Sequence, residues 1–296
     1  MLTRSTLFGQ TREPVTRPKG SLLKWIGSKY SMAVEIASYF PKDYGTFFDV
    51  FLGSGPVLAT VAPNAGVGCD SFSPLIEIWR TLQVSPEKLK SWYATRWREV
   101  MKEGEGKKVL GYEKIKASYN TNPNGADFLF LCRSCYGGVI RFRKADGYMS
   151  TPCGPHTPID PDSFASRVDE WHARVRGCSF VCGDYAESMG MAKQGDLVYC
   201  DPPYSHSQGI LYGAQSFNLS HLLEVIAACK KRGVYVALSI DGTKRSGDML
   251  CDLPIPSGLF EREVFVRVGR SMLKRFQMNG QSLEKEEVSD RLLLTY

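Results

Sequence analysis

The sequence predicts an α/β protein whose seven-stranded, mostly parallel sheet is interrupted by a mainly helical insertion. Three observations lead to this fold class. Two short apolar runs, typical of strands buried on both faces, lie before position 71, and five more follow position 178. The stretch between them, residues 73–175, is rich in Trp, Tyr, Lys and Arg and favours helices and loops. Apolar runs that alternate with helical patterns are typical of a parallel, doubly wound sheet.

The expected elements begin with residues 1–19, where Thr, Arg, Pro and Gly without periodicity predict a mobile arm. Residues 31–39 favour a helix that Pro41 would end. The expected strands are TFFDVF (46–51), GVGCD (66–70), SFVC (179–182), DLVYC (196–200), VYVALSI (234–240), FEREVFVRV (260–268) and RLLLTY (291–296).

Two further elements follow from turn and cap signals. Asp146-Gly147, between alternating residues of the stretch 141–152, predicts a β-hairpin inside the insertion. Residues 219–232 favour a helix, with Ser220 as N-cap and Gly233 just beyond its end. The last two strands have no helix between them, so we expect an edge hairpin that makes one strand antiparallel. The predicted organisation is an arm (1–19), a sheet domain (20–72 and 176–296) and an insertion (73–175).

Composition limits the class of protein. The chain has 296 residues, of which 43% are hydrophobic, so it can bury a sizeable core. A formal net charge of +6 is compatible with a polyanionic partner without requiring one. We find no transmembrane run and no signal-peptide pattern, and nine scattered cysteines indicate reduced thiols. These features predict a soluble, intracellular protein.

One cysteine pattern admits a metal. Cys132 and Cys135 form a CxxC pair, and Cys153 and His156 form CxxH further along the insertion. Soft ligands at such spacing can hold tetrahedral zinc. Because Cys132 ends the apolar run FLFLC and cysteines are often buried without any metal, we expect no metal here.

Three segments before the insertion carry candidate ligand-binding groups. The strand containing Asp49 runs into Gly53-Ser54-Gly55, where glycines would let a ligand approach the backbone or simply allow a tight turn. Asp70 ends the next strand, where it could bind ribose hydroxyls or cap a helix. Upstream, SLLKWIGSKY brings together Trp25, Gly27 and Lys29, which could close over a cofactor or form a packed loop. No phosphate-binding loop is present, so a nucleoside without pyrophosphate is favoured.

The stretch YCDPPY follows the strand DLVYC. Asp201 is expected at the carboxyl edge of the sheet, where ligands bind, and Pro202 and Pro203 stiffen the turn while leaving carbonyl groups available. An acid and a carbonyl are two acceptors for an exocyclic amino group, and Tyr204 could stack on the ring that carries it. The alternative is a turn at a strand end.

Four motifs in this order resemble those of the Dam-like (D12 class, alpha-arrangement) DNA adenine-N6 methyltransferases: KWIGSK, FLGSG, Asp70 and DPPY. The stretches FLFLCRSCYGGVIRFRKADGYMSTPCG, CGDYAES and RVGRS…RLLLTY are also similar to family segments. The resemblance implies a Rossmann-like methyltransferase sheet, with residues 73–175 as the target-recognition domain. It also explains Cys132 and Cys153 without metal.

The resemblance implies a role for individual residues. S-adenosylmethionine would be bound by Trp25, Gly27, Lys29, Asp49, Gly53, Gly55, Asp70, Asp184, Tyr185 and Asp201. The catalytic groups would be Asp201, the Pro202 carbonyl and Tyr204. Contacts with DNA would come from Arg133, Tyr136, Arg141, Phe142 and Arg143, although the alternative for the last three is a solvated hairpin with a packed Phe.

The implied reaction is methyl transfer to N6 of an adenine flipped out of double-stranded DNA, in the cytoplasm of a bacterium or phage-infected cell. A monomer or weak dimer is expected, and a cognate restriction endonuclease is left open as partner. Cys132, Gly137 and Gly138 depart from the family pattern at recognition positions, so no target sequence is carried over. The alternatives are an RNA adenine methyltransferase, an inactive nucleic-acid-binding module and an NAD-type oxidoreductase.

Overall fold

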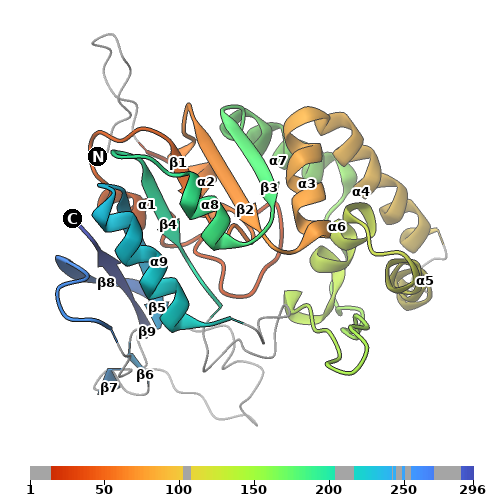
Figure 1. The fold of residues 1–296 in the computed structure, drawn as a ribbon. Helices are drawn as coiled ribbons and strands as arrows, with labels where there is room; N and C mark the ends of the chain where they lie inside the picture. The colour runs from red at the N-terminus through yellow and green to blue at the C-terminus, as the bar shows by residue number, and fades with distance from the viewer. Residues whose placement is uncertain are drawn as a thin grey trace.

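The computed structural model describes residues 15–102, 108–203, 217–241, 243–244, 249–250, 255–269 and 288–296. The predicted seven-stranded sheet is confirmed, with strand order β3-β2-β1-β4-β5-β9-β8 (Figure 1). The strands are β1 (Phe47–Asp49), β2 (Gly66–Asp70), β3 (Cys178–Cys182), β4 (Leu197–Cys200), β5 (Tyr235–Asp241), β8 (Arg262–Gly269) and β9 (Val288–Leu294). Within this sheet β9 pairs antiparallel with both neighbours and the remaining pairs are parallel, as predicted. A short pair, β6 (Thr243–Lys244) and β7 (Met249–Leu250), was not predicted.

The central strands are buried on both faces, which explains their continuous apolar sequence. In β4, Leu197 and Tyr199 pack into one hydrophobic cluster, whereas Val198 and Cys200 pack into a second cluster on the opposite face. The second face is covered by α8 (Tyr185–Met191) and α9 (Leu219–Lys231).

The helix predicted over 31–39 is α1 (Ala33–Ser38), and α2 (Pro56–Val61) follows the glycine turn. The prediction that Ser220 caps α9 is wrong. Asn218 is the N-cap, and its side chain accepts a hydrogen bond from the N–H of His221. Gly233 has a φ of +73° beyond the helix end, as predicted for a C-terminal glycine.

The insertion is mainly helical, as predicted. Its helices are α3 (Ser73–Val84), α4 (Pro86–Met101), α5 (Lys108–Thr121), α6 (Gly125–Ser134), the short η1 (Tyr136–Gly138) and α7 (Pro161–Arg174). Figure 1 shows α4, α5 and α6 on the right of the view, beyond the β3 side of the sheet. The predicted hairpin is irregular: Phe142 and Met149 form an isolated bridge, and Arg143 N–H donates to the Tyr148 carbonyl at 2.9 Å.

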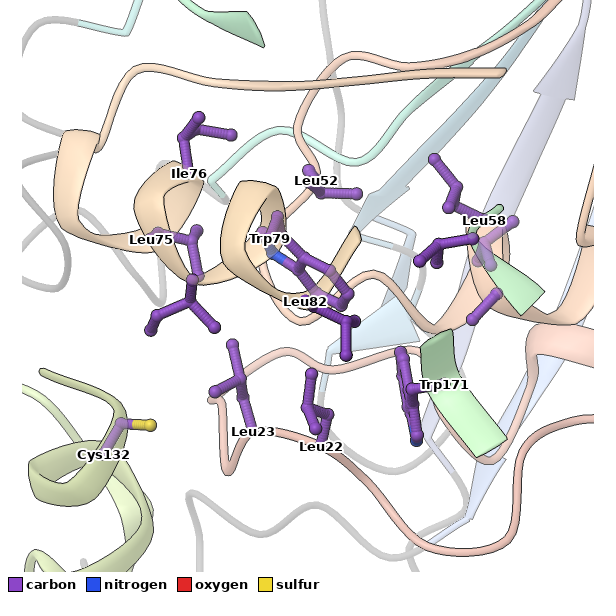
Figure 2. Packing of buried hydrophobic residues seen from close by; sticks show 14 of the residues in the cluster. Leu22, Leu23, Leu52, Leu58, Leu75, Ile76, Trp79, Leu82, Cys132 and Trp171 are labelled. Atoms are coloured by element: carbon purple, nitrogen blue, oxygen red, sulfur yellow. The ribbon is translucent and has the colours of Figure 1, made fainter. Parts of the chain in front are cut away.

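The sheet and the insertion share one hydrophobic cluster. Trp79 of α3 stacks on Phe180 of β3, with ring centroids 5.6 Å apart, and lies 5.7 Å from the Trp171 ring of α7. Figure 2 shows Leu22 and Leu23 beside these two indoles. Each of these side chains is at most 5% exposed, so the interior of the molecule is continuous across the predicted boundary.

Part of the predicted arm is anchored. The Lys19 N–H donates to Glu170 of α7 at 2.8 Å, the Arg174 guanidinium donates to the Thr16 carbonyl, and the Tyr30 hydroxyl donates to the Pro18 carbonyl at 2.5 Å. The segment 16–19 is therefore fixed to α7, and of the arm only the segment 1–14 lies outside the described part. Among the described helices, none is long and apolar enough to cross a membrane.

Candidate active site

A cavity lies at the carboxyl ends of β1, β2 and β4, the edge at which parallel sheets bind ligands. It brings together most of the residues that the sequence nominated for the cofactor. Those that line it are Trp25, Gly27, Lys29, Gly53, Asp70, Asp184, Tyr185 and Asp201. They come from both sides of the insertion in the sequence, so no local pattern could have placed them together.

The glycine turn and Asp70 form one hydrogen-bonded unit. Asp70 Oδ2 accepts from the Gly53 N–H at 3.0 Å, and Oδ1 accepts from the Phe72 N–H at 3.0 Å. Gly53 has a φ of +48°, and a Cβ there would lie 3.1 Å from Nε1 of Trp25. Burial raises the pKa of Asp70 above its ordinary value, although these backbone donors oppose the shift. The turn and the acid therefore hold each other at the cavity wall.

Asp49 and Gly55 are not among the residues that line the cavity, so their predicted roles as cofactor ligands stay predictions. A Cβ at Gly55 would lie 2.9 Å from the Trp79 ring, and the φ there is +58°, so glycine is required. Asp49 is 2% exposed, and its Oδ1 has no hydrogen-bond partner. Burial, together with the charges of Asp201 and Asp70, raises the pKa of Asp49 well above its ordinary value.

Lys29 lies at the other side of the cavity and is 4% exposed. Its ammonium group is 2.8 Å from Oδ1 of Asp201 and 3.3 Å from Oδ2 of Asp290, and it donates to the Gly27 carbonyl at 3.3 Å. Burial lowers the pKa of Lys29, but the two carboxylates outweigh burial and the net shift is upward. The sequence missed Asp290 because a single acid before RLLLTY gives no signal of what it faces.

Three aromatic side chains that contact one another line part of the cavity. The rings of Phe51 and Tyr185 are 5.0 Å apart, and Phe217 lies edge-on to Phe51 at 5.9 Å. The Tyr185 hydroxyl is 2.8 Å from Nδ1 of His221, and burial raises the pKa of Tyr185 to about 12. Phe72, on the same cavity, was also missed. These phenylalanines gave no sequence signal beyond their position next to Gly53, Asp70 and Asn218.

The described residues include the first three positions of the DPPY motif, Asp201, Pro202 and Pro203. Asp201 lines the cavity with Pro203, whereas Pro202 is buried beside them. Tyr204 lies outside the described residues, so its predicted stacking role stays a prediction.

The predicted DNA-contacting residues divide into two groups. The prediction for Arg133 is contradicted: its side chain is 3% exposed and donates to the carbonyls of Ser21 and Leu22 at 3.0 and 2.6 Å. Arg133 therefore anchors the segment that precedes Trp25. Tyr136, Arg141 and Arg143 are exposed.

Phe142 of the hairpin packs against a residue that lines the cavity. This half-buried ring lies 5.7 Å from the ring of Phe72, which itself lines the cavity. Arg143 forms a bidentate ion pair with Asp146, at 2.6 and 3.1 Å. Phe142 is thus packed as well as placed near the site.

The cysteines considered for zinc take part in protein contacts. Cys132 donates to the Leu129 carbonyl at 3.3 Å, and Cys135 and Cys153 face each other in an isolated antiparallel bridge. Burial raises the pKa of the Cys132 and Cys135 thiols to about 12. Within the described ranges, no group of three or more His, Cys, Asp or Glu side chains is arranged to hold a metal ion.

Comparison with known proteins adds to this geometry. Residues 25–258 match the D12 class N6 adenine-specific DNA methyltransferase family. The chain belongs to this family. The predicted family and the predicted class of enzyme are therefore confirmed, and the cavity at the sheet edge is the candidate active site of an adenine-N6 methyltransferase.

Curated relatives of this methyltransferase come from bacteria and a phage. The DNA N-6-adenine-methyltransferase of Escherichia phage P1 is 26% identical over 270 residues, which are 87% of this chain but 34% of that protein. The DNA adenine methylase of Serratia marcescens is 28% identical over 187 residues, 62% of this chain and 67% of that protein. The DNA adenine methylase of Escherichia coli is 26% identical over 230 residues, which are 74% of this chain and 80% of that protein. The chain thus spans about a third of the phage relative and most of the bacterial ones.

Proposed function

We propose that this chain transfers a methyl group from S-adenosylmethionine to N6 of an adenine flipped out of double-stranded DNA. The observation that carries the proposal is a single cavity in which Asp201 of the DPPY motif shares walls with Asp70 and the glycine turn. Asp201 can accept hydrogen bonds from an amino group, and Asp70 with the glycine turn can bind a nucleoside cofactor.

The charge and chemistry of the cavity fit this cofactor. Its described lining includes three carboxylates, Asp70, Asp184 and Asp201, and one lysine, Lys29, which is ion-paired. An acid-rich site with aromatic walls favours a ligand that carries ammonium and sulfonium charges and disfavours pyrophosphate. The residues proposed to hold S-adenosylmethionine are Trp25, Gly27, Lys29, Gly53, Asp70, Asp184 and Tyr185.

The groups proposed to contact the cofactor can still accept hydrogen bonds or stacking partners. Each carboxylate oxygen of Asp70 accepts one backbone hydrogen bond and has a second acceptor site for a ribose hydroxyl. The Tyr185 ring, braced by Phe51, offers a flat apolar surface to an adenine ring. When bound, the cofactor supplies a methyl group activated by a positively charged sulfur.

The chain's own contribution to the reaction is to orient and polarise the target amino group. Asp201 and the Pro202 carbonyl accept hydrogen bonds from the N6 amino group, so its lone pair is aimed away from the ring plane. Fixed positioning of reactants can contribute up to about 7–11 kcal/mol. The same acceptors stabilise the positive charge that develops on N6, and no strong general base is needed because the proton can leave afterwards.

The substrate must reach this cavity from a duplex. Extruding a base costs a few kcal/mol, and stacking inside the pocket offsets part of that cost. Arg141 and Tyr136 are exposed on the insertion, and Phe142 of the hairpin contacts Phe72, which lines the cavity, so this surface is proposed to contact the DNA. Lysine and arginine contacts with phosphates would make binding depend on salt. A cytoplasmic location and a cognate restriction endonuclease stay expectations.

The test is the variant Asp201→Ala. Methyl incorporation into duplex DNA should be lost, whereas calorimetry should show cofactor affinity mostly unchanged, because Asp70 and the glycine turn are intact. Asp169→Asn, which changes an exposed carboxylate on α7, is the matched control and should methylate normally. Normal turnover by Asp201→Ala contradicts the proposal.

Substrate assays separate the alternatives. Equal amounts of labelled methyl donor with duplex DNA and with structured RNA distinguish a DNA enzyme from an RNA enzyme. No incorporation into either would favour a binding module, and saturable binding of NAD would favour an oxidoreductase. Sequencing of methyladenine in DNA from a methylation-free host that expresses the chain would then give the target sequence.

A further inference from the structure

Asp290 enters the site from an unexpected direction. It lies near the start of β9, opposite Asp241 at the end of β5. Because β9 runs against β5, its first residues lie at the edge of the sheet where β4 and β5 end. This edge is where Asp201 emerges, so the single antiparallel strand brings a second carboxylate to the catalytic aspartate.

The link between the two acids is the ammonium group of Lys29. Its three N–H donors have acceptors on Asp201, Asp290 and the Gly27 carbonyl, at 2.8, 3.3 and 3.3 Å. Lys29 and Asp290 are 4% and 8% exposed. A charge buried to this degree is stable only while it keeps an ionic partner.

In the proposed reaction, two donors compete for the carboxylate of Asp201. The target amino group must donate to this carboxylate, but Lys29 already donates to its Oδ1. If Lys29 lost its contact with Asp201 and had no nearby carboxylate to receive it, the arrival of the base would leave a buried ammonium group poorly compensated. A second carboxylate 3.3 Å from the same nitrogen removes that conflict.

We propose that Asp290 is a positioning residue that shares the ammonium group of Lys29 with Asp201 and retains it when the target amino group bonds to Asp201. The inference rests on the proposed function, since it assigns Asp201 to the base. Asp290 itself does not touch the reacting atoms. It keeps Lys29 charged and within the site while the carboxylate of Asp201 becomes available.

The first test is a double-mutant cycle with Asp290→Asn and Lys29→Gln, measured as single-turnover methyl transfer at saturating cofactor and DNA. Asp290→Asn alone should slow methyl transfer by tenfold or more and change cofactor affinity by less than twofold. In the Lys29→Gln background the same substitution should change the rate by less than twofold. An equal loss in both backgrounds indicates a structural role and overturns the proposal, as does an unchanged rate in the wild-type background.

The second test does not depend on methyl transfer. The pH titration of Lys29 Cε, followed by ¹³C NMR, should move to lower pH in Asp290→Asn, because one of its carboxylate partners is neutral. Glu263→Gln is the matched control, since Glu263 lies on the neighbouring strand β8 and pairs with Arg291. An unchanged Lys29 titration in Asp290→Asn overturns the proposal. If the wild-type protein fails to methylate DNA, the proposed function falls, and this titration still decides whether Asp290 holds Lys29.

Discussion

At the scale of single residues, the buried carboxyl of Asp49 lies in an environment that disfavours its charge. Asp49 places a carboxyl group beneath the glycine turn, where burial and two neighbouring acids raise its pKa. The backbone N–H groups of Phe51 and of Leu58, in the first turn of α2, lower the pKa and oppose part of this rise. The position of this carboxyl is therefore unfavourable for an ionised group.

This position predicts a pH-dependent effect of Asp49→Asn. An acid whose folded-state pKa is raised binds its proton more tightly in the folded state, so the free energy of unfolding falls as the pH rises between the unfolded and folded pKa values. Asparagine does not titrate. The stability of Asp49→Asn relative to wild type should therefore rise from pH 5 to pH 8, by at most about 1.4 kcal/mol per pH unit. Urea unfolding at the two pH values measures the difference, and a constant difference would contradict the assignment.

At the scale of elements, the N-cap of α9 contributes both to stability and to the cavity wall. Asn218 caps α9 directly after Phe217, which lines the cavity, so the cap also fixes one aromatic wall. Replacement of an N-cap asparagine by alanine typically costs about 1 kcal/mol. We expect Asn218→Ala to lower the free energy of unfolding by this amount. Ser220→Ala is the control and should have little effect, because Ser220 lies inside the helix; chemical denaturation of both variants distinguishes the two caps.

The hairpin predicts an unequal effect of two neighbouring arginines. Arg141→Ala should weaken DNA binding and reduce the slope of log affinity against log salt by about 1, as expected for the loss of one phosphate contact. Arg143→Ala should have a smaller effect, because Asp146 already neutralises its guanidinium. Binding titrations at several salt concentrations measure both. Identical curves for Arg141→Ala and wild type would remove Arg141 from the DNA interface.

Most elements could be predicted from the sequence because strands buried on both faces are continuous apolar runs, and the motifs follow these runs directly. The position of Asp70 beside Gly53 could be predicted because adjacent parallel strands end at the same edge. Asp290 and Phe217 could not, since their role depends on strand order and on segments distant in sequence. The family resemblance assigned Arg133 to DNA, and only the folded contacts with Ser21 and Leu22 show that it is internal.

At the scale of the whole molecule, the cavity joins the N-terminal loop, both early strands and the later half of the sheet. A ligand that binds only this assembled site should stabilise the entire fold. At a free concentration 100 times its dissociation constant, S-adenosylmethionine should add about 2.7 kcal/mol. The midpoint of thermal unfolding should then rise by several degrees. At the same concentration Asp70→Ala should show a much smaller rise, and equal shifts for the two proteins would argue against the role of Asp70.

The shared interior of sheet and insertion has a consequence for how such enzymes can be recombined. Trp79 of α3 donates a hydrogen bond to the Gly53 carbonyl at 3.0 Å and its ring stacks on Phe180 of β3, so the first helix of the insertion is also packed against the sheet and the glycine turn. A chimera that exchanges residues 73–175 between relatives would cut through this interior. Crossover points that leave α3 and α7 with the recipient sheet, and exchange only the segment between them, should give folded hybrids with transferred sequence preference.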